Sequence, residues 1–402
     1  MNQFSELNLC SALRDNLKRN CFVTPTPVQA EAIPPAMAGR DVVATAQTGT
    51  GKTLAFAIPL LEALAAAPRA KTIKALILSP TRELAIQIEE AFANLTPGTR
   101  IKTAVVVGGM SEGNQLRAIR AGAEVVIATP GRLCDFLQRR LVDLSKVSTI
   151  VLDEADRMLD MGFLPSLRAI LKTLPAQRQT MLFSATIETS VAHLIQDYVT
   201  NPVRISIGTA TKPCEQVDLH LFEIDAHNKL ELLTILLKEN RGSALVFART
   251  KHGADRLANN LSKSGFKTTR IHGDRSQSQR NQALQGFKDG DYRILVATDV
   301  AARGIHVDGI SYVVNFDLPQ VSEDFIHRVG RTGRAGARGT AWTFATPMER
   351  SEIRQIEKGL GLKMKVLDLP EGMPEGSKVV VIPVAPRRAR SFSPRRRGFG
   401  GR

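Results

Sequence analysis

Short runs of apolar residues alternate with longer segments in which apolar and polar residues repeat at helical spacing. Such runs, rich in Val, Ile and Leu, predict buried strands, and the segments between them predict amphipathic helices. In the first half we expect strands at residues 41–46, 75–80, 103–109, 124–129, 149–155 and 179–186. In the second half we expect strands at residues 219–224, 243–248, 268–273, 293–299, 310–316 and 340–346. This alternation is typical of parallel sheets flanked by helices.

The pattern pauses once in the middle of the chain and breaks down before its end. Residues 208–217 contain turn-forming residues and little periodicity, which predicts a linker. We therefore expect two tandem α/β domains, at 1–207 and 218–370, each with a mostly parallel sheet flanked by helices. Residues 371–402 are rich in Pro, Gly and Arg and cannot bury a core, so we expect a disordered basic tail that holds a polyanion electrostatically. A merely solubilising tail is the alternative.

Composition narrows the class of protein. The chain has 402 residues, of which 43% are hydrophobic, and a net charge of +15 that predicts a polyanionic partner. The four cysteines are far apart and form no CxxC pair, which argues against a zinc site and favours a reducing compartment. No apolar run approaches the roughly twenty residues of a membrane span. We expect a soluble, cytoplasmic monomer with no membrane partner.

Residues 46–53, AQTGTGKT, fit the phosphate-binding pattern G-x-x-x-x-G-K-[ST], with Ala46 in the first glycine position. The segment follows an expected strand and precedes an expected helix, which is the context that this loop needs. Its backbone N–H groups would close around phosphates, Lys52 would reach the β- and γ-phosphates, and the Thr53 hydroxyl would bind Mg²⁺. The other loop residues of this site are Thr48, Gly49, Thr50 and Gly51. An ordinary glycine-rich turn is the alternative.

A second motif, TIVLDEAD at residues 149–156, ends an apolar run with acidic residues. Carboxylates at the carboxyl end of a buried strand lie where α/β sheets bind ligands. Asp153 is suited to hold Mg²⁺ through water, and Glu154 is placed to orient and deprotonate an attacking water. Together the two motifs predict ATP hydrolysis with Mg²⁺, whereas a solvated acidic cluster is the alternative.

These motifs together resemble the DEAD-box RNA helicases. AQTGTGKT, PTRELA (80–85), TPGR (129–132), DEAD (153–156) and SAT (184–186) follow that family's order. The resemblance runs from about Phe4 to about Thr346, and at a finer level it is to the short bacterial RhlE-like group. It implies two tandem RecA-like domains with ATP between them, and hydrolysis of ATP to ADP and phosphate on RNA binding. It also implies local separation of short RNA duplexes or remodelling of RNA–protein complexes.

The segment CFVTPTPVQ resembles the family's adenine-binding motif. Gln29 has the amide that can pair with adenine N6 and N7 together. Phe22 would stack on the base, and Phe4 resembles an isolated upstream aromatic residue that the family uses there. Cys21 stands where the family usually has Gly, which predicts a local backbone adjustment with binding retained.

The segment HRVGRTGR resembles the family's last helicase motif. The resemblance implies that Arg331 and Arg334 reach the γ-phosphate from the second domain and that His327 helps to sense it. Charge neutralisation of this kind requires the two domains to close. Gly304 and His306 resemble the ribose-binding segment, in which His306 replaces the family's usual Asp and predicts slightly weaker ATP binding. A basic surface loop is the alternative for the arginines.

The resemblance also implies an RNA-binding track that crosses both domains. Its expected residues are Pro80, Thr81, Arg82, Gly109, Thr129, Pro130, Gly131 and Arg132 in the first domain, and Arg249, Gln277, Arg280 and Thr298 in the second. Arginines fork onto phosphates, and such contacts follow the backbone and 2′-hydroxyls, so we expect RNA to be bound with little sequence specificity.

The SAT motif is expected to couple the two sites. Ser184, Ala185 and Thr186 would bond to DEAD, including Asp156, and a variant without both hydroxyls would keep ATPase activity but lose unwinding. A DNA-translocating helicase with the same core and an ATP-gated RNA clamp or annealing protein remain the rival functions. Ribosome-assembly and RNA-decay proteins are candidate partners.

Overall fold

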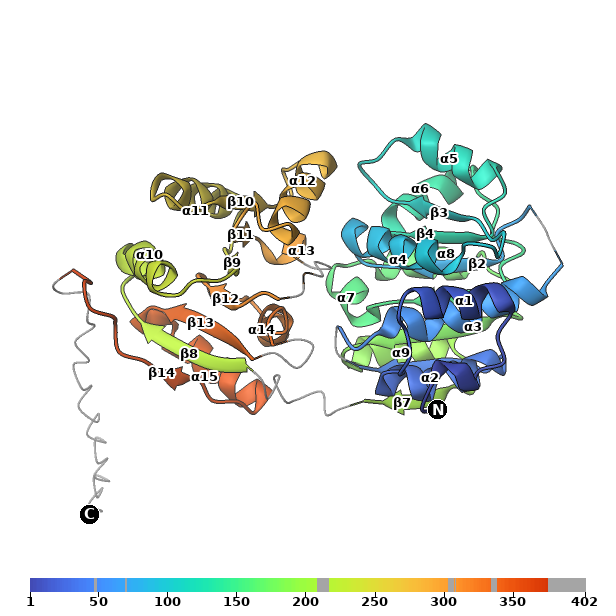
Figure 1. Cartoon of the computed structure of the whole chain (residues 1–402), viewed down its shortest axis with the longest axis horizontal. Helices are drawn as coiled ribbons and strands as arrows, with labels where there is room; N and C mark the ends of the chain where they lie inside the picture. The colour runs from blue at the N-terminus through green and yellow to red at the C-terminus, as the bar shows by residue number, and fades with distance from the viewer. Residues whose placement is uncertain are drawn as a thin grey trace, which may run out of the picture.

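The computed structural model describes residues 1–46, 49–68, 71–207, 217–302, 307, 309–333 and 338–374, which form two α/β domains lying side by side (Figure 1). The first contains η1 (Phe4–Glu6), α1 (Ser11–Arg19), α2 (Pro27–Met37), β1 (Val42–Thr45), α3 (Lys52–Ala66), β2 (Ala75–Leu78), α4 (Arg82–Leu95), β3 (Thr103–Val106), α5 (Glu112–Arg120), β4 (Val125–Ala128), α6 (Pro130–Gln138), β5 (Thr149–Leu152), α7 (Ala155–Asp160), α8 (Leu164–Leu171), β6 (Gln179–Ser184), α9 (Thr189–Tyr198) and β7 (Val203–Ser206). The second contains β8 (Val217–Glu223), η2 (Ala226–Asn228), α10 (Lys229–Glu239), β9 (Ala244–Phe247), α11 (Lys251–Lys263), β10 (Thr268–Ile271), α12 (Gln277–Lys288), β11 (Ile294–Ala297), α13 (Asp299–Ala302), β12 (Tyr312–Asn315), α14 (Ser322–Val329), β13 (Gly339–Ala345), η3 (Pro347–Glu349), α15 (Arg350–Leu360) and β14 (Lys365–Val366).

Each domain is built on a seven-stranded sheet, and the strand pairs in both sheets are parallel. The strand orders are β3-β4-β2-β5-β6-β1-β7 and β10-β11-β9-β12-β13-β8-β14. Numbered from its own first strand, the second sheet repeats the order of the first. Because parallel strands all end at the same edge of a sheet, the loops that follow them gather there, where α/β proteins place their ligands.

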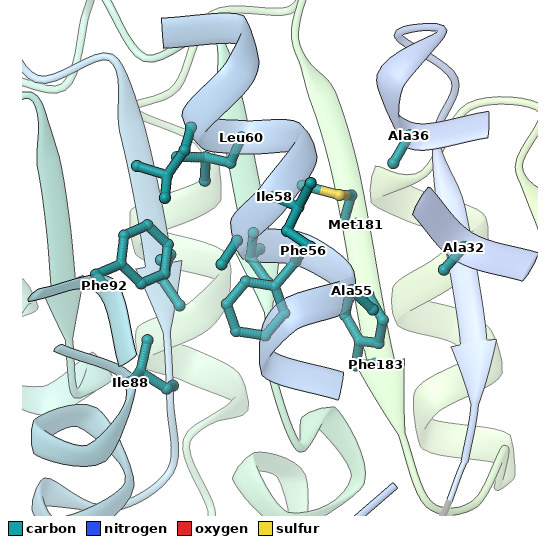
Figure 2. Close-up of a cluster of buried hydrophobic side chains, with 14 of the residues drawn as sticks. Ala32, Ala36, Ala55, Phe56, Ile58, Leu60, Ile88, Phe92, Met181 and Phe183 are labelled. Atoms are coloured by element: carbon teal, nitrogen blue, oxygen red, sulfur yellow. The ribbon is translucent and has the colours of Figure 1, made fainter. Parts of the chain in front are cut away.

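Both sheets are covered on each face by helices, which explains the continuous apolar runs in the sequence. All four residues of β2, β4 and β5 are buried, as are those of β9 and β11, which is expected for central parallel strands. Figure 2 shows one of these layers, in which α3 packs on the sheet. The Phe56 ring centroid lies 6.5 Å from that of Phe92 in α4 and 5.4 Å from that of Phe183 in β6. These contacts fix the start of α3 relative to α4 and β6.

The expected strands are all present, and β7 and β14 are strands that the pattern did not predict. The expected domain boundaries stay a prediction. Val217 begins β8 instead of ending the linker, and Met373 packs against the second core just beyond the expected boundary. Residues 208–216 of the linker and 375–402 of the tail lie outside the described part of the chain. Among the described residues, no helix is both long enough and apolar enough to cross a membrane.

Candidate active site between the two domains

The glycine-rich loop connects β1 to α3 in the first domain. Gly49 and Gly51 have φ angles of +88° and +87°, which only glycine adopts at little cost. A Cβ on Gly51 would also lie 2.3 Å from Gln29 Nε2, so glycine is required there twice over. Lys52 begins α3, is 6% exposed, and donates from Nζ to the Ala46 carbonyl oxygen at 3.0 Å. Thr53 follows it, Thr50 lies two residues before it, and Thr48 lies outside the described residues.

Gln29 ties the expected adenine motif to this loop. Its Oε1 accepts from the Thr26 backbone N–H at 2.8 Å, and its Nε2 donates to the Gly51 carbonyl oxygen at 2.9 Å. These bonds fix the orientation of the amide, and they leave one N–H and one oxygen lone pair for further bonds. An amide held in this way can recognise a base without first ordering its own side chain.

The three residues flagged around the adenine motif have different surroundings. Phe22 is 37% exposed, whereas Phe4 is 4% exposed and belongs to the first core. The Phe4 backbone N–H donates to the Val23 carbonyl oxygen at 3.1 Å, so Phe4 helps to hold the loop that contains Phe22. Cys21 has a φ of +58° and therefore adopts the left-handed conformation that its glycine counterpart would take freely.

Asp153 and Glu154 follow β5 and are 3% and 4% exposed. Burial raises the pKa of Asp153 to about 7, although the charge of Lys52 opposes this shift. Burial alone would also raise the pKa of Glu154, but the positive charges of Arg157, Lys52 and Arg331 outweigh it and lower that pKa well below its usual range. Glu154 is therefore held as a carboxylate by groups from both domains.

The SAT segment is hydrogen-bonded to DEAD as the sequence led us to expect. Asp156 Oδ2 accepts from the backbone N–H groups of Ala185 and Thr186, both at 2.9 Å, and from Thr186 Oγ1 at 3.2 Å. Ser184 Oγ accepts from the Asp156 backbone N–H at 3.2 Å and donates to the Thr186 carbonyl oxygen. The end of β6 is thus fixed to the start of α7; whether it transmits nucleotide state stays a prediction.

The second domain brings the HRVGRTGR segment to this site. Arg331 is 2% exposed, and its Nε donates to the His327 carbonyl oxygen at 3.1 Å. Burial, and then the charge of Arg157, lower the pKa of His327 well below its usual range. A small cavity at this junction is lined by Arg157 of the first domain and by Phe247, Asp299, Ala302, Asp324, His327, Arg328 and Arg331 of the second. Arg334, Gly304 and His306 lie outside the described residues.

Sequence reasoning missed Arg328 and Arg157. Arg328 is 2% exposed and forms a bidentate pair with Asp299 at 2.6 and 2.7 Å, while its guanidinium lies 4.9 Å from the Phe247 ring centroid. It also donates to Asn315 Oδ1 at 3.1 Å, so it joins the ends of three neighbouring strands. In the sequence, Arg328 could have been found from its position next to His327, and Arg157 from its position three residues after Glu154.

The expected RNA track of the first domain is held by contacts within the protein. A Cβ on Gly109 would lie 2.2 Å from Arg82 Nη1 and one on Gly108 3.1 Å from Arg82 Nη2. These two adjacent glycines therefore make room for the Arg82 guanidinium. Thr81 caps α4 by accepting from the Leu84 backbone N–H at 3.3 Å. Arg132 pairs with Asp135 at 2.9 Å and with Glu112 at 3.4 Å. Thr129, Pro130 and Gly131 form the start of α6.

Two residues of the second domain that are expected to bind RNA contact the first domain. Arg280 Nη2 and Gln277 Nε2 each lie 3.0 Å from Glu83 Oε1, a carboxylate that belongs to PTRELA. Glu83 and Gln277 are buried, at 5% and 7% exposure. These bonds join α12 to α4 across the junction, which the sequence analysis did not anticipate.

Arg249 and Thr298 follow β9 and β11 at the same edge of the second sheet. The Arg249 backbone N–H donates to Asp317 Oδ2 at 2.8 Å, and its guanidinium lies 3.4 Å from Glu349 Oε1. The side chain is 46% exposed, so it remains accessible to a phosphate. Thr298 begins the turn into α13, where its carbonyl oxygen accepts from Ala301 and Ala302.

Comparison with known proteins identifies the family. Residues 26–194 match the family model described as DEAD/DEAH box helicase, and residues 228–336 match the helicase conserved C-terminal domain. DEAD-box ATP-dependent RNA helicase CshA of Bacillus subtilis is 41% identical over 91% of this chain and 74% of its own length, and that of Geobacillus kaustophilus is 40% identical over 92% and 79%. The likeness to the RhlE-like group stays a prediction.

Solved structures agree in fold. S. cerevisiae Dbp5 bound to RNA and ADP BeF3 has a TM-score of 0.83 at 31% identity, covering 91% of this chain and 96% of that one. A DEAD box protein from Methanococcus jannaschii has a TM-score of 0.54 at 38% identity, covering 92% and 99%. The closer sequence thus has the poorer overall superposition at similar coverage, which is the behaviour of two domains arranged differently. From its motifs, paired RecA-like domains and relatives, this chain belongs to the DEAD-box ATP-dependent RNA helicases.

Proposed function

We propose that hydrolysis takes place at the junction of the two domains and only while they are closed on each other. The observation that carries this proposal is the cavity that Arg157 of the first domain lines together with His327 and Arg331 of the second, and the charge of Arg331 accordingly contributes to the lowered pKa of Glu154. Separation of the domains would remove that charge and the cavity wall that His327 and Arg331 provide. The domain boundaries at 1–207 and 218–370 are part of this proposal.

In this proposal the first domain binds ATP. Gln29 and Phe22 hold the adenine, and the loop from Gly49 to Thr53 surrounds the phosphates, with Lys52 at the β- and γ-phosphates. The chemistry of the residues fits Mg²⁺, because Asp153 offers a buried carboxylate close enough to feel the charge of Lys52, Thr53 next to Lys52 offers a hydroxyl, and this ion prefers oxygen ligands. When bound, Mg²⁺ would neutralise phosphate charge. Gly304 and His306 are assigned to the ribose.

The remaining roles belong to the reaction itself. Glu154 orients the attacking water and takes its proton, and Arg331 and Arg334 neutralise the charge that develops on the phosphate oxygens. His327 senses the γ-phosphate from the same wall. Asp156, held by Ser184 and Thr186, carries the nucleotide state to the end of β6, so the two hydroxyls couple ATP use to unwinding.

RNA is assigned to the track along the carboxyl edges of both sheets. Support comes from the four arginines at those edges, Arg82, Arg132, Arg249 and Arg280. Arg132 would exchange its carboxylate partners for phosphates, whereas Arg280 would bind RNA while keeping its contact with Glu83. Because these groups recognise backbone geometry, we expect RNA in preference to DNA and little sequence specificity. RNA as substrate also favours a cytoplasmic location, with ribosome-assembly or RNA-decay proteins as further partners.

The test is the steady-state ATPase rate with no nucleic acid, with single-stranded RNA and with single-stranded DNA, at one fixed salt concentration. Strong stimulation by RNA alone is expected. Equal stimulation by DNA would favour the DNA-translocating rival. If RNA stimulates hydrolysis but the protein anneals the strands of short duplexes faster than it separates them, the clamp or annealing function would be favoured.

A further inference from the structure

Glu154 and Arg157 form a buried ion pair at the start of α7. Arg157 Nη1 lies 2.9 Å from Glu154 Oε2, and the two side chains are 3% and 5% exposed. Taking two charges out of water is unfavourable, and apolar residues of similar volume often serve stability as well or better. Stability alone is therefore a weak reason for an arginine at this position, and the position beside the proposed water-orienting carboxylate provides a better one.

The backbone at Glu154 makes the side chain depend on an outside partner. Glu154 has φ +51° and ψ +55°, a left-handed conformation, and it precedes the first helical residue of α7. The sharp turn from β5 is held by the Glu154 N–H, which donates to Asp153 Oδ1 at 3.1 Å. That bond fixes the main chain but does not set the torsions of the glutamate side chain. The Arg157 guanidinium donates to one carboxylate oxygen, Oε2, at 2.9 Å and so helps to fix it in place.

Arg157 also lies where the two domains meet. It lines the cavity whose other wall includes His327, Arg328 and Arg331 of the second domain. Its charge also contributes to the lowered pKa of His327, which lines the same cavity. Its own backbone N–H donates to Asp156 Oδ1 at 2.9 Å, so Arg157 is anchored to DEAD at one end and reaches the second domain with the other.

We propose that Arg157 is a positioning residue for hydrolysis, which holds the Glu154 carboxylate in one orientation and is itself fixed by the wall of the second domain when the domains close. This inference rests on the proposed role of Glu154 as the residue that orients the attacking water. Arg157 acts through Glu154, so its loss slows the chemical step without weakening ATP binding. Closure thereby completes the site in two ways, by bringing Arg331 and by fixing Arg157.

The test compares Arg157→Met, Arg157→Lys and the control Arg168→Met under saturating RNA. Met keeps much of the length and volume of Arg without its charge, and Lys restores the charge without the planar fork. Arg168 lies on α8, 4.0 Å from Asp197 with about half of each side chain exposed, so its variant removes a surface charge only. We expect Arg157→Met to lower kcat by about tenfold to a hundredfold with the KM for ATP within about twofold, because small displacements of catalytic groups have effects of this size.

Two further readouts separate positioning from a general structural role. RNA binding with a non-hydrolysable ATP analogue should stay within about twofold of the parent protein, because closure is retained. Arg157→Lys should recover part of kcat, and it serves alone if the Met variant does not fold. A parallel loss of closed-state RNA binding and kcat, unrelieved in the Lys variant, would overturn the inference.

A double variant with Glu154→Gln completes the experiment, measured in single turnover with excess enzyme. If Arg157 acts through Glu154, adding Arg157→Met to Glu154→Gln causes no further loss. A further loss by the same factor as in the parent would overturn the inference. Should Glu154→Gln be inactive while Arg157→Met retains full kcat, the role of Arg157 fails and that of Glu154 stands. A fully active Glu154→Gln would overturn both.

Discussion

Lys52 begins α3 in the first domain, and Lys229 begins α10 in the second, each after the first strand of its own sheet. Both side chains are buried, at 6% and 4% exposure. The sheets have the same strand order, so the two lysines occupy equivalent places. Their partners differ: Lys52 Nζ donates to the Ala46 carbonyl oxygen, whereas Lys229 Nζ lies 3.2 Å from the Phe316 carbonyl oxygen and 3.4 Å from Glu349 Oε2.

The difference shows what a phosphate site needs besides a lysine. In the first domain the preceding loop contains two left-handed glycines, Gly49 and Gly51, whose backbone leaves room for phosphate. In the second domain a single 3-10 turn, η2, takes the place of that loop, and Glu349 supplies the negative charge from within the chain. In our proposal the same fold therefore forms a nucleotide site in the first domain, whereas in the second domain a carboxylate of the chain pairs with the equivalent lysine.

Replacing each lysine by methionine is the most direct way to break this comparison. Lys52→Met should lower kcat/KM for ATP by at least about a hundredfold, because it removes a charge placed at the phosphates. Lys229→Met should leave the KM for ATP unchanged but lower the free energy of unfolding by about 2 kcal/mol, because Glu349 loses its buried partner. RNA-stimulated ATPase assays and denaturant unfolding measure the two effects. A Lys229→Met protein with impaired ATP binding and normal stability would contradict the comparison.

The junction of the domains is tested by Glu83→Gln. Arg280 would lose the carboxylate that it contacts while remaining largely buried at 11% exposure, so the closed arrangement is weakened. Hydrogen bonds to charged groups contribute about 1.5–3 kcal/mol. We expect RNA to bind about tenfold to a hundredfold more weakly in the presence of a non-hydrolysable ATP analogue, with little change in its absence.

Glu89→Gln is the matched control for this experiment. Glu89 lies on the same helix and accepts from Thr103 Oγ1 at 3.1 Å, entirely within the first domain. It should leave RNA affinity unchanged both with and without the analogue. Equal weakening by Glu83→Gln in the two conditions would show that Glu83 serves the first domain alone and not the closed arrangement.

The two sheets could be predicted from sequence far better than the contacts between them. Central strands are buried on both faces and so appear as unbroken apolar runs, but β7 alternates exposed and buried positions and both residues of β14 are exposed. The motifs located the site in each domain. Glu83 and Gln277 meet although they are 194 positions apart, and no local pattern reports such a contact. Arg157 was near enough to Glu154 to be predicted, because the third residue of a helix can reach back to the residue that precedes the helix.

The pH dependence of closure tests how much His327 of the second domain contributes to the closed arrangement. In the closed arrangement burial, followed by the charge of Arg157, lowers the pKa of His327, whereas an exposed histidine titrates near 6.5. As the pH falls below about 6.5, the separated form binds a proton that the closed form does not, so closure becomes less favourable by at most about tenfold per pH unit. Stability of the closed form therefore rises with pH through this window.

His327→Gln isolates this effect, because Asp153 titrates in the same range with the opposite sign: its pKa is raised to about 7 by burial. RNA affinity with a non-hydrolysable analogue should be measured from about pH 5.5 to 7.5 in the parent and in the variant. The difference between the two curves should grow as the pH falls. Parallel curves would mean that His327 keeps an ordinary pKa in the closed form.

The smallest effect is expected at Cys21, where the first domain holds strain that its nucleotide site does not need. Cys21→Gly removes a side chain at φ +58°. Relief of left-handed strain favours the folded state by about 1 kcal/mol, and the greater freedom of glycine in the unfolded chain offsets part of it. We expect the free energy of unfolding to rise by about 0.5 kcal/mol and the KM for ATP to stay within about twofold. A marked change in KM with unaltered stability would mean that the cysteine side chain itself, and not the backbone conformation at this position, sets how Phe22 meets the base.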